Sequence, residues 1–285
     1  VSCYNSLKIG GGSHTLNRLN LKEVALASNC SVDQYLNEAL PKYVQLMAEL
    51  MTARIKFLVE ESNFFNSDWL VKEELISLDK FSAMFGIFGL AEAVNILMER
   101  AGEPGKYGHS AASDDLGYLI TSKVAELVAK IEMPYCEGNG GRAFMHSQSG
   151  IDLDLDVTAG TRIPIGTEPD LFHHLKTVSR HHHLFASGIS DVLSFDETAV
   201  NNPQAVVDVI RGAFDAGMRD FTFNLDSNDF IRITGYLVRK SDLAKMPDAR
   251  HSSTKLGAGS VAGSFVDKRN LKRVMSHENA AGSNS

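Results

Sequence analysis

The chain has 285 residues, 44% hydrophobic and 22% charged, with a formal net charge of -7 at pH 7. This length and composition allow a sizeable core in one large or two small domains, and the acidic balance argues against nucleic acid or an acidic membrane as a partner. The three cysteines, Cys3, Cys30 and Cys136, are too widely spaced for a disulfide framework or a Cys-x-x-Cys zinc site. This use of cysteine predicts a protein of the reducing cytoplasm, and no apolar run is long enough to span a bilayer.

The first predicted helix begins at Ser31. Ser31 and Gln34 have the spacing of a capping box, and the apolar residues that follow keep to one face: Tyr35, Leu36, Leu40, Tyr43, Val44, Met47, Leu50 and Met51. Because proline disrupts a helix interior, Pro41 is expected to divide the stretch into a short helix and a long one that ends near Ser62.

A second helical region is predicted over residues 68–100, and a third helix over residues 113–131. Within the second region, residues 81–93 are apolar almost all round, which indicates burial. Gly86 and Gly89 would each weaken a helix by about 1 kcal/mol relative to alanine. The glycines therefore suggest a strand or loop that enters a helix near Gly89, or close packing against another backbone.

Histidines crowd the helix predicted over residues 170–184. Adjacent histidines on a helix point in different directions, so His181, His182 and His183 cannot all ligate one metal. His174 and His181 share a face, but no carboxylate has a matching spacing, so a metal site is the weaker interpretation. We expect one of these histidines, with His174 as the candidate, to face a substrate pocket.

A β-α-β unit is predicted further along the chain. Residues 188–195 and 221–225 have the pattern of strands, and between them Asn202 supplies a helix N-cap with Pro203 at the first helical position. The chain then leads directly into a strand-like stretch that contains Gly235.

Gly235 interrupts the alternation of residues 227–238, and on local pattern alone it would mark a bulge or a close approach of two backbones. The surrounding sequence from Arg232 to Tyr236, Arg-Ile-Thr-Gly-Tyr, resembles the Arg-Val-x-Gly-Tyr signature of glycyl radical enzymes. Those enzymes store an unpaired electron on the glycine α-carbon. Glycine suits this task, because without a Cβ the α-carbon can flatten and the radical is delocalised over the flanking amide groups.

Cys3 precedes the run Gly10-Gly11-Gly12, an arrangement similar to the cysteine loop of the same enzymes. In that family a cysteine on a loop inside a barrel gives its hydrogen atom to the glycyl radical and attacks the substrate as a thiyl. The transfer is nearly reversible, because S–H and glycine Cα–H bonds are close in strength. An inert, buried cysteine beside a flexible end is the alternative when Cys3 is considered alone.

The subclass that the whole sequence resembles is the YjjI-type glycine radical family. Its Cys-Tyr-Asn-Ser-Leu loop, its Arg-Ile-Thr-Gly-Tyr-Leu-Val motif and its Arg-Val-Met-Ser-His-Glu ending look like residues 3–7, 232–238 and 273–278. Pyruvate formate-lyase-like members have a second cysteine where Ser2 stands, and diol- and choline-type members have a glutamate where Asn5 stands. Anaerobic ribonucleotide reductases carry a C-terminal zinc site of four cysteines, which this sequence lacks.

The resemblance implies an α/β fold: a ten-stranded barrel made of two five-stranded halves, surrounded by helices, with the cysteine and glycine loops meeting inside. Residues 1–240 would supply the second half, with the glycine radical region at about 185–240. Because a cysteine on an interior loop needs chain before it, Cys3 predicts that this is the C-terminal portion of a longer polypeptide. An exposed half-barrel edge would favour a homodimer.

Residues 241–285 are expected to form a basic, partly ordered tail. Nine Lys/Arg stand against three Asp/Glu from Arg239 to Arg273. A solvated tail is the simpler interpretation, and a docking surface for an activating enzyme or for a phosphorylated ligand is the alternative.

The resemblance also implies a mechanism. An iron-sulfur, S-adenosylmethionine-dependent activase would take a hydrogen atom from Gly235, and Cys3 would then become the thiyl that attacks a small-molecule substrate. Arg232 and Tyr236 would help to hold the glycine loop, and no metal or organic cofactor need bind this chain. Oxygen would cleave the backbone at Gly235, so the setting would be anaerobic.

Residues 162–169 resemble a strand-end loop that lines the substrate cavity of the same enzymes. Arg162 and Glu168 are therefore candidates for substrate binding, with Glu168 as an acid/base group or an anchor. The alternative for Glu168 is a surface carboxylate that favours the N-terminus of the following helix.

Other functions remain open at this point. One is a non-catalytic radical-carrier module that docks on a larger partner, although Cys3 counts against it; another is an enzyme similar to anaerobic ribonucleotide reductase. An ordinary α/β binding protein with chance motif matches would place Gly235 on the surface, more than about 15 Å from Cys3 and well beyond contact distance.

Overall fold

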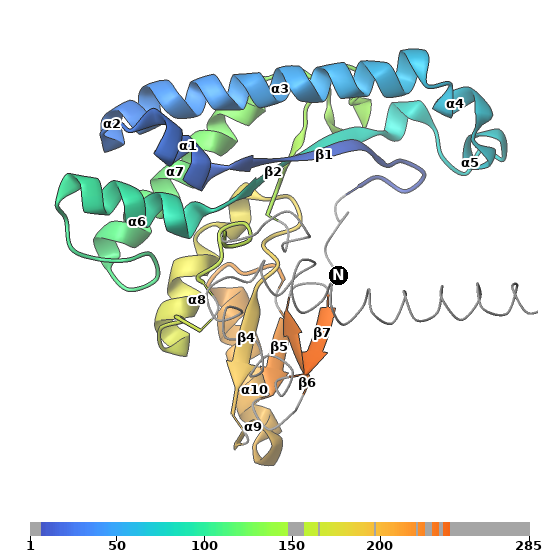
Figure 1. The fold of residues 1–285 in the computed structure, drawn as a ribbon. Coiled ribbons are helices and arrows are strands. Elements are labelled where there is room, and N and C mark those ends of the chain that lie inside the picture. Colours follow the sequence, from blue (N-terminus) through green and yellow to red (C-terminus); the bar gives the residue numbers. More distant parts are fainter. Residues whose placement is uncertain are drawn as a thin grey trace, which may run out of the picture.

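The structure is a computed structural model that describes residues 7–147, 157–164, 166–196, 198–220, 222–225, 230–233 and 236–239. The strands are β1 (Ser13–Asn20), β2 (Ser82–Phe88), β3 (Phe144–His146), β4 (Val192–Phe195), β5 (Thr222–Leu225), β6 (Phe230–Ile233) and β7 (Tyr236–Arg239) (Figure 1). The longer helices are α1 (Leu21–Ser28), α3 (Leu40–Lys56), α6 (Leu90–Ala101), α7 (Ala111–Lys130), α8 (Leu171–Ser179) and α10 (Pro203–Asp215). Short helices are α2 (Val32–Gln34), α4 (Phe64–Ser67), α5 (Trp69–Lys72) and α9 (Thr198–Asn201). Across these ranges no helix combines the length and the apolar character that a bilayer crossing requires.

The first five strands run parallel, with helices in each connection. β1, β2 and β3 form one sheet in that order, and β4 pairs with β5 in a second. A parallel bridge between Ser147 and Ile189 joins the end of β3 to the chain that leads into β4. The five strands therefore follow one another in chain order, as repeated β-α-β units do. This arrangement confirms the predicted α/β class and the β-α-β unit that contains α10.

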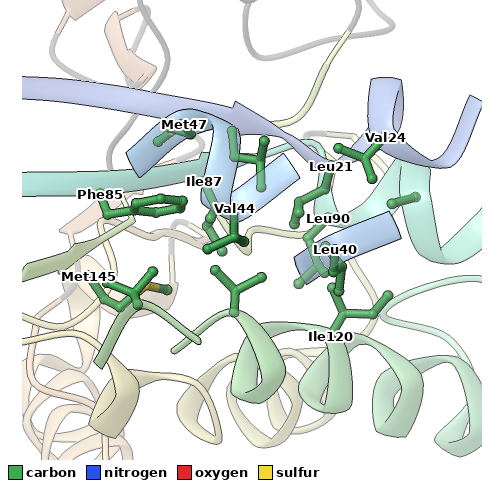
Figure 2. Packing of buried hydrophobic residues seen from close by; sticks show 14 of the residues in the cluster. Leu21, Val24, Leu40, Val44, Met47, Phe85, Ile87, Leu90, Ile120 and Met145 are labelled. Atoms are coloured by element: carbon green, nitrogen blue, oxygen red, sulfur yellow. The ribbon is translucent and has the colours of Figure 1, made fainter. Parts of the chain in front are cut away.

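The hydrophobic core lies against one face of the three-stranded sheet. Strand residues alternate between faces, and Leu19, Phe85, Ile87 and Met145 all point to this one. Figure 2 shows Phe85, Ile87 and Met145 packed against buried side chains of the helices, among them Leu40, Val44, Met47, Leu90 and Ile120. The helices α3, α6 and α7 thus cover this face of the sheet.

The apolar stretch at residues 81–93 is a strand followed by a helix, so the predicted helix over this part is wrong and its alternative is confirmed. Every residue of β2 up to Ile87 is buried, which is typical of a parallel strand covered on both faces. Gly89 has φ +76° and is the N-cap of α6, and this left-handed conformation is the one that glycine adopts readily.

The helix predicted from Ser31 begins as expected. The Ser31 side chain accepts the Gln34 backbone N–H and the Gln34 side chain accepts the Ser31 N–H, so the predicted capping box is confirmed. The predicted division at Pro41 is wrong. A wider π-helical turn, Tyr35–Ala39, runs straight into α3, and the chain stays helical through Pro41.

Three further helices follow local signals closely. Helix α7 begins two residues before its predicted start, after Ser110, whose side chain accepts the Ser113 N–H. The predicted N-cap Asn202 is confirmed, because its side chain accepts the Ala205 N–H ahead of α10. Helix α8 is shorter than predicted: it ends at Ser179, and a separate 3-10 turn spans His182–Leu184. Because of this break, the histidines at 173–174 and those at 182–183 lie on separate elements.

Candidate functional site

A buried ion-pair group lies where the chain leads into β4. Its centre is Asp191, whose side chain is 2% exposed. One carboxylate oxygen lies 2.7 Å from His174 Nε2 and the other lies 3.4 Å from Arg162 Nε. The backbone N–H of Val192 also donates to Asp191, at 2.8 Å. We call Arg162, His174 and Asp191 the Asp191 cluster; it contains two of the three residues expected to bind substrate.

Each member of the Asp191 cluster is positioned by a different element. Asp170 caps α8 by accepting the His173 N–H, and His174 follows one residue later in the first turn. Arg162 follows a loop that is fixed to β2 and α6, because Ala159 bridges Phe88 and Glu92 accepts the Thr158 N–H. The backbone of Asp191 is held to β5, because its carbonyl accepts the N–H of Thr222 at the start of that strand.

Electrostatics keep the Asp191 cluster ionised. Burial alone would raise the pKa of Asp191, but the charge and hydrogen bond of His174 and the charge of Arg162 hold that pKa well below its usual range. Burial alone would lower the pKa of His174, whereas Asp191 raises it above 6.5. The cluster thus places an arginine and a histidine of raised pKa around one buried carboxylate whose pKa is lowered.

Two neighbouring histidines are neutral. Burial lowers the pKa of His181 to about 3 and the pKa of His182 to about 4. His182 Nδ1 accepts the backbone N–H groups of Ile189 and Arg219, at 3.4 and 3.0 Å, so its proton is on Nε2. Through these bonds His182 ties the segment before β4 to the segment before β5.

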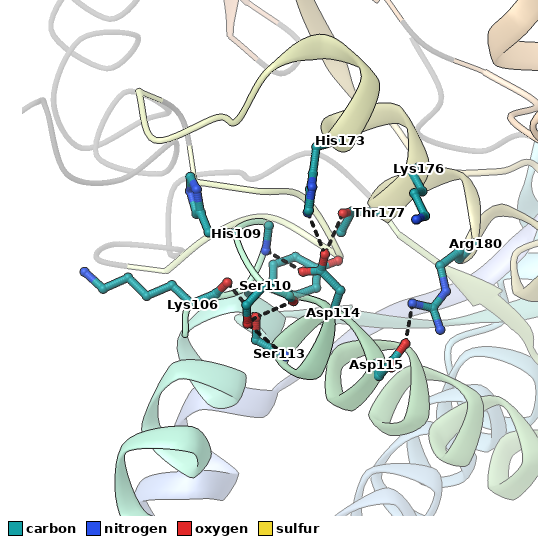
Figure 3. A network of polar contacts seen from close by, with 12 residues as sticks. Lys106, His109, Ser110, Ser113, Asp114, Asp115, His173, Lys176, Thr177 and Arg180 are labelled. Carbon is teal, nitrogen blue, oxygen red and sulfur yellow. Dashed lines mark hydrogen bonds and ion pairs between the residues drawn. The ribbon is translucent and has the colours of Figure 1, made fainter. Parts of the chain in front are cut away.

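A second polar group joins α7 to α8 (Figure 3). Asp114 Oδ2 lies 3.0 Å from His173 Nε2 and accepts the Thr177 hydroxyl at 2.8 Å, while Oδ1 accepts the Gly108 N–H at 2.7 Å. On the surface beside it, Arg180 pairs with Asp115 at 2.7 Å. These contacts fix α8 on α7 and thereby set the position from which His174 reaches Asp191.

The crowded histidines are thus bound to protein groups. The Nε2 atoms of His173 and His174 lie within hydrogen-bond distance of the carboxylates of Asp114 and Asp191. His181 Nε2 lies 3.2 Å from the Tyr107 hydroxyl. Within the described residues, no group of three or more His, Cys, Asp or Glu side chains is placed to hold a metal ion.

The remaining predicted residues lie apart from the Asp191 cluster or outside the described residues. Glu168 is exposed and its Oε2 accepts the Gly166 N–H at 2.6 Å, while the N-cap of α8 is Asp170. Arg232 lies on β6 and Tyr236 on β7, and the pairing of Ile233 with Tyr236 brings the two strands together on either side of positions 234 and 235. Cys3, Gly235 and the predicted tail at 241–285 lie outside the described residues.

Asp191 and Asp114 are the site residues that sequence reasoning missed. Both are charged residues with almost no exposed surface, but in the sequence they stand among ordinary helix and strand positions. A weak signal exists for Asp191, because Ser190-Asp191 is a polar pair directly before the apolar start of a strand.

The raised pKa of His174 predicts a pH dependence of stability. A histidine whose pKa is raised above its unfolded value of 6.5 contributes its full stabilisation below pH 6.5 and loses it as the pH rises through the folded pKa. His174→Gln removes this contribution. We therefore expect the difference in unfolding free energy between the native protein and His174→Gln, measured in urea, to be larger at pH 6 than at pH 9. A difference that is the same at both pH values would show that folding does not raise the pKa of His174.

The fold matches that of known radical enzymes. The chain is similar to a solved anaerobic ribonucleotide reductase with a TM-score of 0.63 and 15% identity, covering 87% of this chain and 46% of that one. It is similar to a glycyl radical enzyme from Archaeoglobus fulgidus with a TM-score of 0.61 and 11% identity, covering 86% and 44%. At these identities the likeness concerns the fold, and the fold is that of the class containing glycyl radical enzymes and anaerobic ribonucleotide reductases.

Comparison of sequences identifies the family within this class. The family described as "Glycyl radical enzyme YjjI-like" matches residues 1–272, and the chain belongs to it. "Uncharacterized protein YjjI" of Escherichia coli (strain K12) is 47% identical over 98% of this chain and 54% of its own length. A protein of Haemophilus influenzae (strain ATCC 51907 / DSM 11121 / KW20 / Rd) is 40% identical over 95% of this chain and 54% of its own. The chain therefore spans about half the length of these relatives.

Proposed function

We propose that this chain is the radical-bearing half of a glycyl radical enzyme, with the radical stored on Gly235 and relayed to Cys3. The observation that carries the proposal is the family match over residues 1–272, which includes both residues. The pairing of β6 with β7 supports it, because the strands directly before and after the proposed radical position in the sequence are held together. Arg232 and Tyr236, on either side, are proposed to hold that loop.

The proposed reaction is a relay of hydrogen atoms between Gly235, Cys3 and the substrate. A radical S-adenosylmethionine activase takes one hydrogen atom from the α-carbon of Gly235, which leaves the unpaired electron there. The Cys3 thiol then gives its hydrogen atom to Gly235 and becomes a thiyl, which takes a hydrogen atom from a carbon of a small substrate. When the product radical takes a hydrogen atom back from Cys3, the reverse transfer restores the glycyl radical. The activase, not this chain, binds the iron-sulfur cluster and S-adenosylmethionine.

The parallel order of β1 to β5 supports a place for this chain as the second half of a ten-stranded barrel. In this proposal the Asp191 cluster fixes the wall of the substrate chamber, with Arg162 and His174 as its members and Glu168 at the rim. The enzyme would work in an anaerobic cytoplasm, in contact with its activase, and the open edges of a half barrel are consistent with a homodimer.

Electron paramagnetic resonance tests the proposal directly. The whole protein, treated anaerobically with its activase, should show a doublet, because one hydrogen remains on the radical carbon. Protein made with α-deuterated glycine should lose the doublet splitting. Competence of the activase is checked by its reductive cleavage of S-adenosylmethionine. With a competent activase, the absence of a signal, or a signal that deuterated glycine leaves unchanged, would refute the glycyl radical.

A further inference from the structure

The three-stranded sheet has a second face, turned away from the hydrophobic core, and it carries polar residues in register. Arg18 of β1 pairs with Gly86 of β2, and Gly86 pairs with His146 of β3. Residues paired in register across a sheet point to the same face. Arg18, Gly86 and His146 therefore form a single row across the sheet, which we call the Arg18 row.

The core residues show that the Arg18 row is on the opposite face. Leu19 pairs with Ile87 and Phe85 pairs with Met145, and all four are in the hydrophobic core. Arg18 and His146 are each adjacent in sequence to one of these four, so their side chains point to the opposite face. His146 is nevertheless 3% exposed. The basic side chain of Arg18 and the buried imidazole of His146 thus lie on the same face of the sheet.

Gly86 gives Arg18 the room to lie across the sheet. A Cβ placed on Gly86 would be 2.6 Å from Arg18 Cγ and 3.1 Å from the backbone oxygen of Asn17. The aliphatic part of Arg18 therefore occupies the space that any other residue at position 86 would fill. Beyond it, Arg18 Cζ lies 5.2 Å from the centre of the Phe88 ring. This cation-π contact holds the guanidinium over the last residue of β2.

The position of the guanidinium is the one at which parallel sheets bind ligands. Phe88 is at the carboxyl end of β2, and ligands of open parallel sheets bind beyond the carboxyl ends of the strands. A guanidinium also presents a planar fork of N–H donors that fits a carboxylate or a phosphate with two parallel hydrogen bonds.

We propose that the Arg18 row is the anion-binding subsite of this protein: Arg18 binds the carboxylate or phosphate group of a small acidic substrate, and His146 hydrogen-bonds to the same molecule. In naming the ligand as substrate, the inference rests on the proposed radical function. It deepens that function by assigning the substrate class. No bond is made or broken in this step; Arg18 and His146 hold the molecule near the carboxyl ends of the strands.

Calorimetric titration of the whole protein, without activation, tests the proposal. The probes are two matched pairs: lactate with lactamide, and glycerol 3-phosphate with glycerol. In each pair the acidic probe should bind and the neutral one should not, and the pair that responds distinguishes a carboxylate from a phosphate. Arg18→Gln should weaken binding about 10- to 100-fold, as expected for the loss of a charged hydrogen-bonding partner. Arg18→Lys should weaken it less, because the charge remains.

Two further variants provide the controls. Arg142→Gln makes the same change of charge at an exposed position just before β3, at the other end of the sheet, and should bind as the native protein does. Gly86→Ala keeps the charge of Arg18, but the added methyl group displaces the aliphatic part of that side chain. We therefore expect weaker binding of the acidic probe although no charge is lost. Urea unfolding of every variant identifies any that fail to fold.

The subsite is refuted if no acidic probe binds the native protein, or if the neutral probes bind equally well. It is also refuted if a folded Arg18→Gln protein binds as tightly as Arg142→Gln. Because these titrations need no radical, a failure here leaves the resonance test of Gly235 untouched. If the resonance test of Gly235 failed instead, the anion site would stand, but its ligand could no longer be called the substrate of a radical reaction.

Discussion

Gly235→Ala is expected to abolish the radical. The activase must reach the α-carbon, and the carbon must then become planar; a methyl group hinders both. We expect no glycyl doublet after anaerobic treatment with the activase. We also expect no backbone cleavage when the treated protein is exposed to air, whereas the native protein should be cut at residue 235. Resonance spectra and the mass of the fragments measure the two effects independently.

Gly212→Ala is the matched control. Gly212 lies within α10, and nothing stands within 4 Å of a Cβ placed there. Since alanine favours a helix interior over glycine by about 1 kcal/mol, this variant should be slightly more stable than the native protein. It should keep the radical signal and the cleavage. A doublet of full intensity in Gly235→Ala would move the radical to another residue and overturn the assignment.

Asp191→Asn is expected to produce a large loss of stability. The substitution removes the carboxylate that neutralises Arg162 and His174, both of which are almost completely buried. Breaking a buried ion pair by removing one partner costs about 3–5 kcal/mol, because the remaining charge has no compensation. Urea unfolding at pH 6, where His174 is protonated, should show this loss in full.

Asp115→Asn serves as the comparison for Asp191→Asn. Asp115 makes an equally short contact with Arg180, but its side chain is 67% exposed, and exposed pairs contribute about 1 kcal/mol or less. The double variant Asp191→Asn with Arg162→Met should recover part of the lost stability, since the uncompensated guanidinium is then absent. If Asp191→Asn costs no more than Asp115→Asn, the Asp191 cluster does not hold the sheet together.

Local signals in the sequence predicted several elements closely. The capping box of Ser31 and Gln34 and the Asn202-Pro203 helix start each involve groups at most three residues apart, so the side chains that decide the structure are adjacent in sequence. Residues 81–88 show the limit of this approach. Their apolar side chains fit either a buried helix or a strand covered on both faces, and only pairing with β1, over sixty residues away, decides between them.

The site was less predictable than the elements. Arg162 and His174 were expected to bind substrate individually, and the residue that unites them, Asp191, carries no motif of its own. The Arg18 row depends on register across three strands, and a shift of one residue would turn every side chain to the other face. Register is set by packing between distant segments. The order of residues in one sequence therefore does not reveal which residues of two strands pair.

The parallel order of the strands has a consequence for synthesis on the ribosome. Asn20 and Phe88 are in register although 68 positions (88 minus 20) separate them. At about 5–20 residues per second, β1 waits about 3–14 s for the partner that covers its edge. Each later strand waits in turn for its own helix-containing connection. On the side where the next strand will pair, the nascent chain therefore presents the edge of the strand made last, and a chaperone or a second chain that binds there would have to recognise that moving edge.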